Sequence, residues 1–98
     1  MSRIEKRLEK WRNPNNKQEV PKDDLESVLN HFFPEMWHSS KTGSHNYQIK
    51  HPMFKKYPDI YSYEGVLTIP TKGGQKIKHY YIKSLLQAID LITEVENG

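Results

Sequence analysis

The sequence predicts an α+β fold of two layers, in which helices cover one face of a three-stranded antiparallel sheet. Two observations lead to this prediction. Apolar residues recur every three or four positions near both ends of the chain, as on the buried face of a helix. Between those segments, short stretches rich in β-branched and aromatic residues are separated by turn-forming residues. A chain of 98 residues suits one small domain.

The first helix is predicted where Ile4, Leu8 and Trp11 share one face. It is either an added element that packs on the domain or docks a partner, or a solvated helix with one apolar stripe. A turn rich in Asn and Pro follows it. We therefore expect residues 1–20 to form an N-terminal helix and linker, and residues 21–98 to form the domain proper.

A second helix is predicted over residues 21–33, where proline and acidic residues suit the first turn. Five apolar residues repeat with helical spacing and form a continuous buried face: Leu25, Val28, Leu29, Phe32 and Phe33. Pro34 ends this helix, because proline cannot donate the next backbone hydrogen bond.

Three strands are predicted, over residues 36–41, 45–50 and 65–71. In the second strand, Tyr47 and Ile49 point to one face, whereas Asn46, Gln48 and Lys50 point to the other. In the first strand, Trp37 is expected to join the core. The meander ends at a proline, which cannot donate to a sheet ladder.

Residues 53–64 show no clear periodicity, so we expect a long loop with at most one turn of helix. The segment carries two lysines among four aromatic residues. Such a combination can hold phosphates and stack bases. Alternatively, the aromatic residues fix the loop to the body of the domain.

A glycine-bearing turn, residues 71–76, precedes a final amphipathic helix predicted over residues 79–95. Free backbone N–H groups and a helix N-terminus favour anions, so the turn is a plausible phosphate site, although its spacing is not that of a P-loop. Lys78, His79 and Lys83 lie near the helix start. They indicate either a bound phosphate backbone or a solvated charge cluster.

Composition indicates a soluble cytoplasmic protein with no membrane contact. The net charge of +3 is consistent with a nucleic-acid partner. The absence of cysteine excludes disulfides and thiolate metal sites. No apolar run approaches the length of a membrane span, and the N-terminus lacks the apolar core of a signal peptide.

Without the first helix, the predicted order αβββα is that of the double-stranded-RNA-binding domain (dsRBD). Gly43-Ser44-His45 follows a helix and a strand, and the segment from Ile69 to Lys78, with its Pro-Thr-Lys-Gly-Gly sequence, precedes an apolar helix. Together these residues resemble the HicA family of mRNA interferase toxins over roughly residues 21–92.

The resemblance implies a dsRBD-like fold, cleavage of mRNA by the histidine that corresponds to His45, and a HicB-like antitoxin that covers the active site. The chain departs from the family pattern at two positions. Asn46 stands where many members have a second histidine, and Lys72 stands where many have a histidine two residues after the proline.

The candidate mechanism is phosphodiester cleavage, with His45 as general base on the ribose 2′ hydroxyl or general acid to the 5′ oxygen. Charge and position suggest further RNA-binding residues: Gly43, Ser44, Lys50, Lys72, Lys76 and Lys78. We expect no cofactor and no metal, because the histidines lack metal-binding spacing. The alternatives are a non-catalytic RNA-binding module and a protein-interaction domain.

Overall fold

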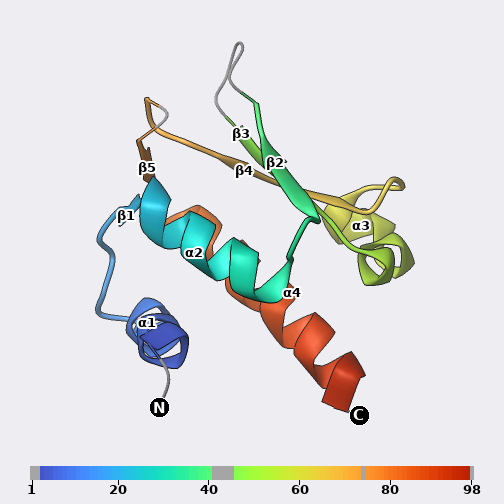
Figure 1. Cartoon of the computed structure of the whole chain (residues 1–98), viewed down its shortest axis with the longest axis horizontal. Helices are drawn as coiled ribbons and strands as arrows, with labels where there is room; N and C mark the ends of the chain where they lie inside the picture. The colour runs from blue at the N-terminus through green and yellow to red at the C-terminus, as the bar shows by residue number, and fades with distance from the viewer. Residues whose placement is uncertain (1–2, 41–45, 74, 98) are drawn as a thin grey trace.

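A three-stranded antiparallel sheet in the order β2-β3-β4 lies on one side of the molecule, above the long helices in the view of Figure 1. The structure, a computed structural model, describes residues 3–40, 46–73 and 75–97. The strands are β2 (Trp37–Ser39), β3 (Asn46–Lys50) and β4 (Val66–Pro70). Together with the helices, this sheet confirms the predicted α+β class.

The two faces of the sheet differ in burial. The inner face carries Tyr47, Ile49, Leu67 and Ile69, all of which are buried in the core. The pairing register places Ile49 beside Leu67 and Tyr47 beside Ile69. The outer face carries polar side chains that are exposed or half-buried: His38, Gln48, Lys50 and Thr68. The predicted alternation along residues 46–50 is therefore confirmed.

Helix α2 (Lys22–Phe32) covers the inner face and is tied to the strands by side-chain hydrogen bonds. The Tyr47 hydroxyl donates to Oε2 of Glu26 at 2.5 Å. The Trp37 indole N–H donates to Oδ1 of Asn30 at 3.0 Å. Trp37 is only half-buried, against the rim of the core.

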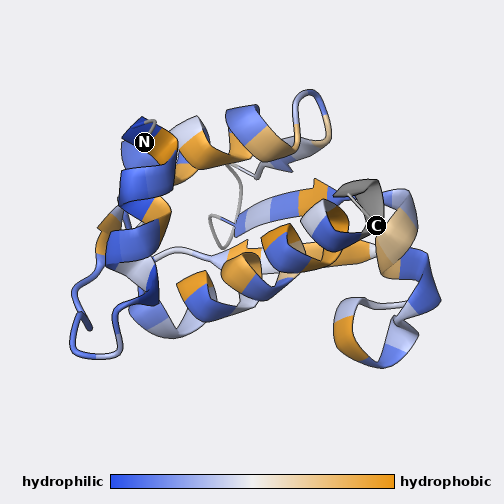
Figure 2. Cartoon of the chain, turned by 90° about the horizontal axis from the view of Figure 1, so that it is seen from below, coloured by the Kyte–Doolittle hydropathy of each residue, from blue (hydrophilic) through white to orange (hydrophobic). Residues whose placement is uncertain are grey.

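Helix α4 (His79–Asn97) contacts β4 and supplies the largest share of the core among the helices. Its buried residues are Ile82, Leu85, Leu86, Ala88, Ile89 and Ile92. Hydrophobic and hydrophilic residues alternate along the helices with the spacing of amphipathic helices (Figure 2). None of the helices in the described ranges is long and apolar enough to cross a lipid bilayer.

Helix α1 (Arg3–Arg12) packs against α4. Of the two alternatives that the sequence left open, a packed helix and a solvated helix, the structure therefore has the packed one. Leu8 and Trp11 are buried. The Trp11 carbonyl oxygen lies 3.0 Å from Nε2 of His79. Arg12 binds Asp90 with both guanidinium NH₂ groups, at 2.7 and 3.0 Å. The helix is thus part of the folded body rather than a solvated arm.

A small second sheet was not predicted. Strand β1 (Val20–Pro21) pairs with β5 (Lys76–Ile77), and the Lys22 N–H donates to the Gln75 carbonyl at 2.9 Å. Because Pro21 belongs to β1, α2 begins one residue later than predicted. The division of the chain between residues 20 and 21 stays a prediction, although it falls inside this strand.

The segment predicted as a loop contains two short helical turns, η1 (Pro52–Lys56) and α3 (Pro58–Tyr61). A proline begins each, because its fixed φ suits the first helical position. Phe54 and Tyr61 are buried, with stacked rings whose centroids are 4.2 Å apart. These two aromatic residues fix the segment to the core.

Candidate nucleic-acid interface

Strand β3 begins at the end of the sheet where β4 finishes. Asn46, the first residue of β3, pairs with Pro70, the last residue of β4. Pro70 leads directly into the basic turn that the sequence marked as a phosphate site. Asn46 directly follows Gly43-Ser44-His45 in the sequence, but these three residues lie outside the described ranges.

The turn after β4 is closed by backbone hydrogen bonds. The Lys72 N–H donates to the Lys76 carbonyl at 2.7 Å, and the Gln75 N–H donates to the Lys72 carbonyl at 3.3 Å. Gly73 has φ of +63°, a value that glycine adopts without strain. The predicted glycine turn is therefore a narrow hairpin that leads into β5.

Three lysines project from this hairpin and the residues after it, and we call Lys72, Lys76 and Lys78 the basic end of the sheet. All three are exposed. Lys72 forms an ion pair with Glu19, with Nζ 3.4 Å from Oε2. Lys72 and Lys78 also line a small pocket of about 220 Å³, together with Tyr81 at the start of α4. The ammonium groups can meet an anion from solvent here.

His79 does not belong to this basic cluster. The sequence grouped it with Lys78 and Lys83, but its ring is buried against α1 and its Nε2 bonds the Trp11 carbonyl. Lys78 and Lys83 remain exposed. His79 therefore joins two helices, which is a structural role.

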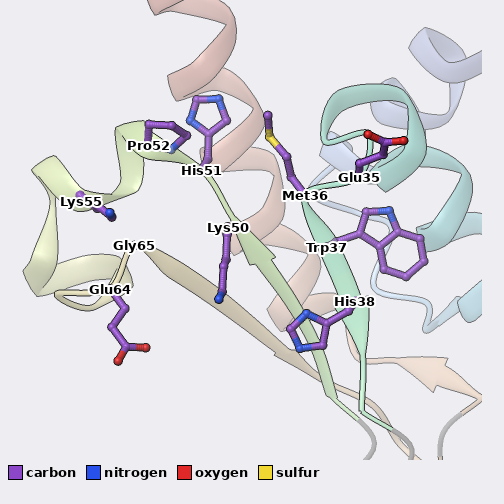
Figure 3. A pocket seen from close by; sticks show the side chains of 10 residues that line it. All are labelled: Glu35, Met36, Trp37, His38, Lys50, His51, Pro52, Lys55, Glu64 and Gly65. Atoms are coloured by element: carbon purple, nitrogen blue, oxygen red, sulfur yellow. The ribbon is translucent and has the colours of Figure 1, made fainter.

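Lys50 lies away from the basic end. It pairs with Val66 at the opposite end of β3, four residues from Asn46 or roughly 13 Å along an extended strand. It lines a broad, open pocket of about 690 Å³ on the outer face (Figure 3). The structure therefore separates Lys50 from the three lysines with which the sequence grouped it.

His38 of this pocket was missed as a candidate site residue, and Lys55 was noted only as one of the two lysines of residues 53–64 that could hold phosphate. His38 pairs with Gln48 across β2 and β3, so it shares the outer face with Lys50. Lys55 comes from η1. The alternation of β2 gives a weak signal for His38, whereas no sequence pattern places η1 beside the strands.

Tyr47 is the described titratable group with the largest pKa perturbation near the start of β3. Burial, and then its hydrogen bond to Glu26, raise the pKa of Tyr47 well above its ordinary value. The side chain therefore stays a neutral donor and anchors β3 to α2. It is not a candidate base at neutral pH.

In residues 3–40, 46–73 and 75–97 no three His, Asp or Glu side chains lie together as metal ligands would. Comparison of the chain with protein-family models, curated proteins and solved structures finds no significant match. A proposal for its function therefore has to start from the residues themselves.

Proposed function

We propose that the chain is an endoribonuclease of the HicA type, the toxin of a toxin–antitoxin pair, which cleaves mRNA with His45 as its catalytic residue. The observation that carries this proposal is the Asn46–Pro70 register. It brings the residue that follows the Gly-Ser-His sequence to the same end of the sheet as Lys72, Lys76 and Lys78. In this proposal His45 acts together with these cations, because proton transfer and charge stabilisation are both needed to cleave a phosphodiester.

The order α2-β2-β3-β4-α4 supports a dsRBD-like fold as part of this proposal. Helices cover one face of the sheet and leave the other face open, which is compatible with that assignment. A HicB-like antitoxin is then the proposed protein partner, and RNA the proposed substrate.

In the proposed reaction, the ribose 2′ oxygen attacks the adjacent phosphorus and the bond to the 5′ oxygen breaks. The products are a 2′,3′-cyclic phosphate and a free 5′ hydroxyl. One proton leaves the 2′ hydroxyl and one reaches the 5′ oxygen, and His45 serves one of these two transfers. The lysines of the basic end stabilise the negative charge that develops on the phosphorane.

The test compares the wild type with His45→Ala, both expressed from a tightly controlled promoter. We expect the wild type to arrest growth with loss of cellular mRNA, and His45→Ala to be harmless although folded. With purified protein, cleavage of a single-stranded RNA should fall by about 10²–10⁴-fold. Cleavage in EDTA checks the expected independence from metal. If neither protein cleaves RNA or slows growth, the proposal is wrong.

A non-catalytic RNA-binding module is the second candidate, and the two departures from the family pattern favour it. Asn46 and Lys72 stand at positions where many members have histidines. This alternative predicts that His45→Ala leaves function intact, while Lys72→Glu or Lys76→Glu abolishes RNA binding. RNA cleavage by the wild type separates the two candidates, because the binding module binds RNA without cleaving it.

A further inference from the structure

The broad pocket on the outer face is lined by residues from three stretches of the chain, within residues 35–38, 50–55 and 64–65 (Figure 3). His38 comes from β2 and Lys50 from β3. Lys55 comes from η1, and Glu64 from the turn before β4. In Figure 3, His38 and Lys50 project from neighbouring strands, and Lys55 and Glu64 border the same hollow. At about 690 Å³, the pocket has room for one nucleotide.

The groups around this pocket suit different parts of a nucleotide. Lys50 and Lys55 are exposed cations that can contact phosphate. Met36, exposed although apolar, provides a surface on which a base can pack, and the half-buried His51 ring, which packs against Phe33 and Phe54, borders the same pocket. The Glu64 carboxylate can accept a hydrogen bond from an exocyclic amino group of a base.

Parts of the pocket are held in place before any ligand binds. The His51 ring is oriented by the Met53 N–H, which donates to Nδ1 at 3.1 Å. The Lys55 segment packs closely against Gly65, because a β-carbon at Gly65 would lie 2.7 Å from the side-chain Cγ of Lys55 and 3.2 Å from its backbone nitrogen. A preformed site loses less conformational entropy on binding than a flexible one.

A polar surface connects the pocket with the basic end of the sheet. Between Asn46 and Lys50, the outer face presents Gln48 and its cross-strand neighbour Thr68. The distance from the start to the end of β3 is roughly 13 Å. An extended polyanion that contacts the basic end can therefore continue along this face to Lys50.

We propose that the outer-face pocket binds one nucleotide of the same single-stranded RNA that the basic end holds. This inference rests on the proposed RNA substrate and adds a second contact site at a distance from the first. Single-stranded RNA is favoured over a duplex, because only an unpaired base can enter the pocket and pack on its walls. The pocket thereby makes binding depend on the length of the strand.

The test measures RNA binding in the His45→Ala background, so that the strand stays intact. The pocket variant is Lys50→Gln/Lys55→Gln, which removes two charges but keeps the Cβ and Cγ atoms of Lys55 that lie against Gly65. The control is Lys6→Gln/Lys10→Gln, which removes two exposed charges from α1. Fluorescence anisotropy with labelled single-stranded RNA of about 2 to 16 nucleotides, from below to the upper end of known site sizes, gives Kd against salt.

We expect the pocket variant to bind the longer RNAs roughly tenfold more weakly, at a few-fold per exposed charge contact. The plot of log K against log salt should become shallower by about 1.4, or about 0.7 for each lost phosphate contact. Dinucleotides should bind the pocket and control variants equally, because at roughly 3.4 Å per stacked nucleotide they cannot span the roughly 13 Å between the two sites. His38→Ala should also weaken binding of the longer RNAs.

Equal binding of the pocket and control variants at every RNA length overturns this inference. Displacement of the RNA from the pocket by millimolar AMP alone, without a length effect, also overturns it in favour of a free-nucleotide site. If the wild type neither binds nor cleaves RNA, the proposed function itself is wrong. If it cleaves RNA but the pocket variant behaves like the control, only the inference about the pocket is wrong.

Discussion

Gly65 borders the outer-face pocket, and its lack of a β-carbon leaves room for Lys55 beside it. Its φ of +74° lies in the left-handed region, and a β-carbon would lie 2.7 Å from Lys55 Cγ and 3.2 Å from the Lys55 backbone nitrogen. Gly73 has a similar φ of +63°, but nothing lies within 4 Å of the position of its β-carbon. Substitution of Gly73 therefore tests backbone strain alone, whereas substitution of Gly65 tests backbone strain together with a steric contact.

We expect Gly65→Ala to lower the free energy of unfolding by about 2–5 kcal/mol, the sum of left-handed strain and a close contact. Gly73→Ala should cost only the backbone term, about 1–2 kcal/mol. Urea unfolding of both variants measures the difference. Equal losses would show that the Lys55 segment moves aside without cost.

At the scale of elements, the Tyr47–Glu26 hydrogen bond joins β3 to α2 and makes stability depend on pH. Burial and Glu26 raise the pKa of Tyr47 in the folded chain above the ordinary value of about 10. The unfolded chain therefore loses this proton first as the pH rises. The stabilisation is fully present below pH 10 and falls above it, by up to about 1.4 kcal/mol per pH unit.

We expect Tyr47→Phe to lower the free energy of unfolding at pH 7 by about 1–3 kcal/mol, because it leaves the Glu26 carboxylate without its donor. The same variant should lose less stability than the wild type between pH 9 and 11. Tyr63→Phe, at a tyrosine that is 87% exposed, is the matched control and should change neither quantity. Parallel pH profiles for the wild type and Tyr47→Phe would contradict the assignment.

Elements with a long periodic pattern could be predicted from the sequence, and short or non-local elements could not. Helices α1, α2 and α4 repeat apolar residues over several turns, and β3 alternates over five residues. Strands β1 and β5 have two residues each, too few for any period. They pair because the folded core brings residues 20 and 77 together, which no local pattern records.

At the scale of the whole molecule, the candidate site was predicted in part. The glycine turn and its lysines could be located because turn chemistry is local. Lys50 was grouped with these lysines because of its charge and its closeness in the sequence to His45, but the extended strand β3 places it at the other end of the sheet. His79 was grouped with the lysines because it follows Lys78 in the sequence. Its buried bond to the Trp11 carbonyl could not be predicted, because it joins residues far apart in the chain.

Glu19 pairs with Lys72 at 3.4 Å, at the basic end of the sheet that we propose as an RNA contact. An RNA phosphate has to compete with this carboxylate for Lys72. We therefore expect Glu19→Gln to strengthen RNA binding by up to about fivefold, the equivalent of one exposed ion pair of at most about 1 kcal/mol. Glu9→Gln, an exposed change of equal charge on α1, is the control. Unchanged or weaker RNA binding by Glu19→Gln would exclude Lys72 from the interface.

The docking of α1 on α4 also affects the order in which the chain can fold during synthesis. Trp11 and the histidine that binds its carbonyl are 68 residues apart. At about 5–20 residues per second, the ribosome needs roughly 3 to 14 s to make that intervening chain. During that time Leu8 and Trp11 have no α4 to pack against, so α1 is made well before the helix on which it docks.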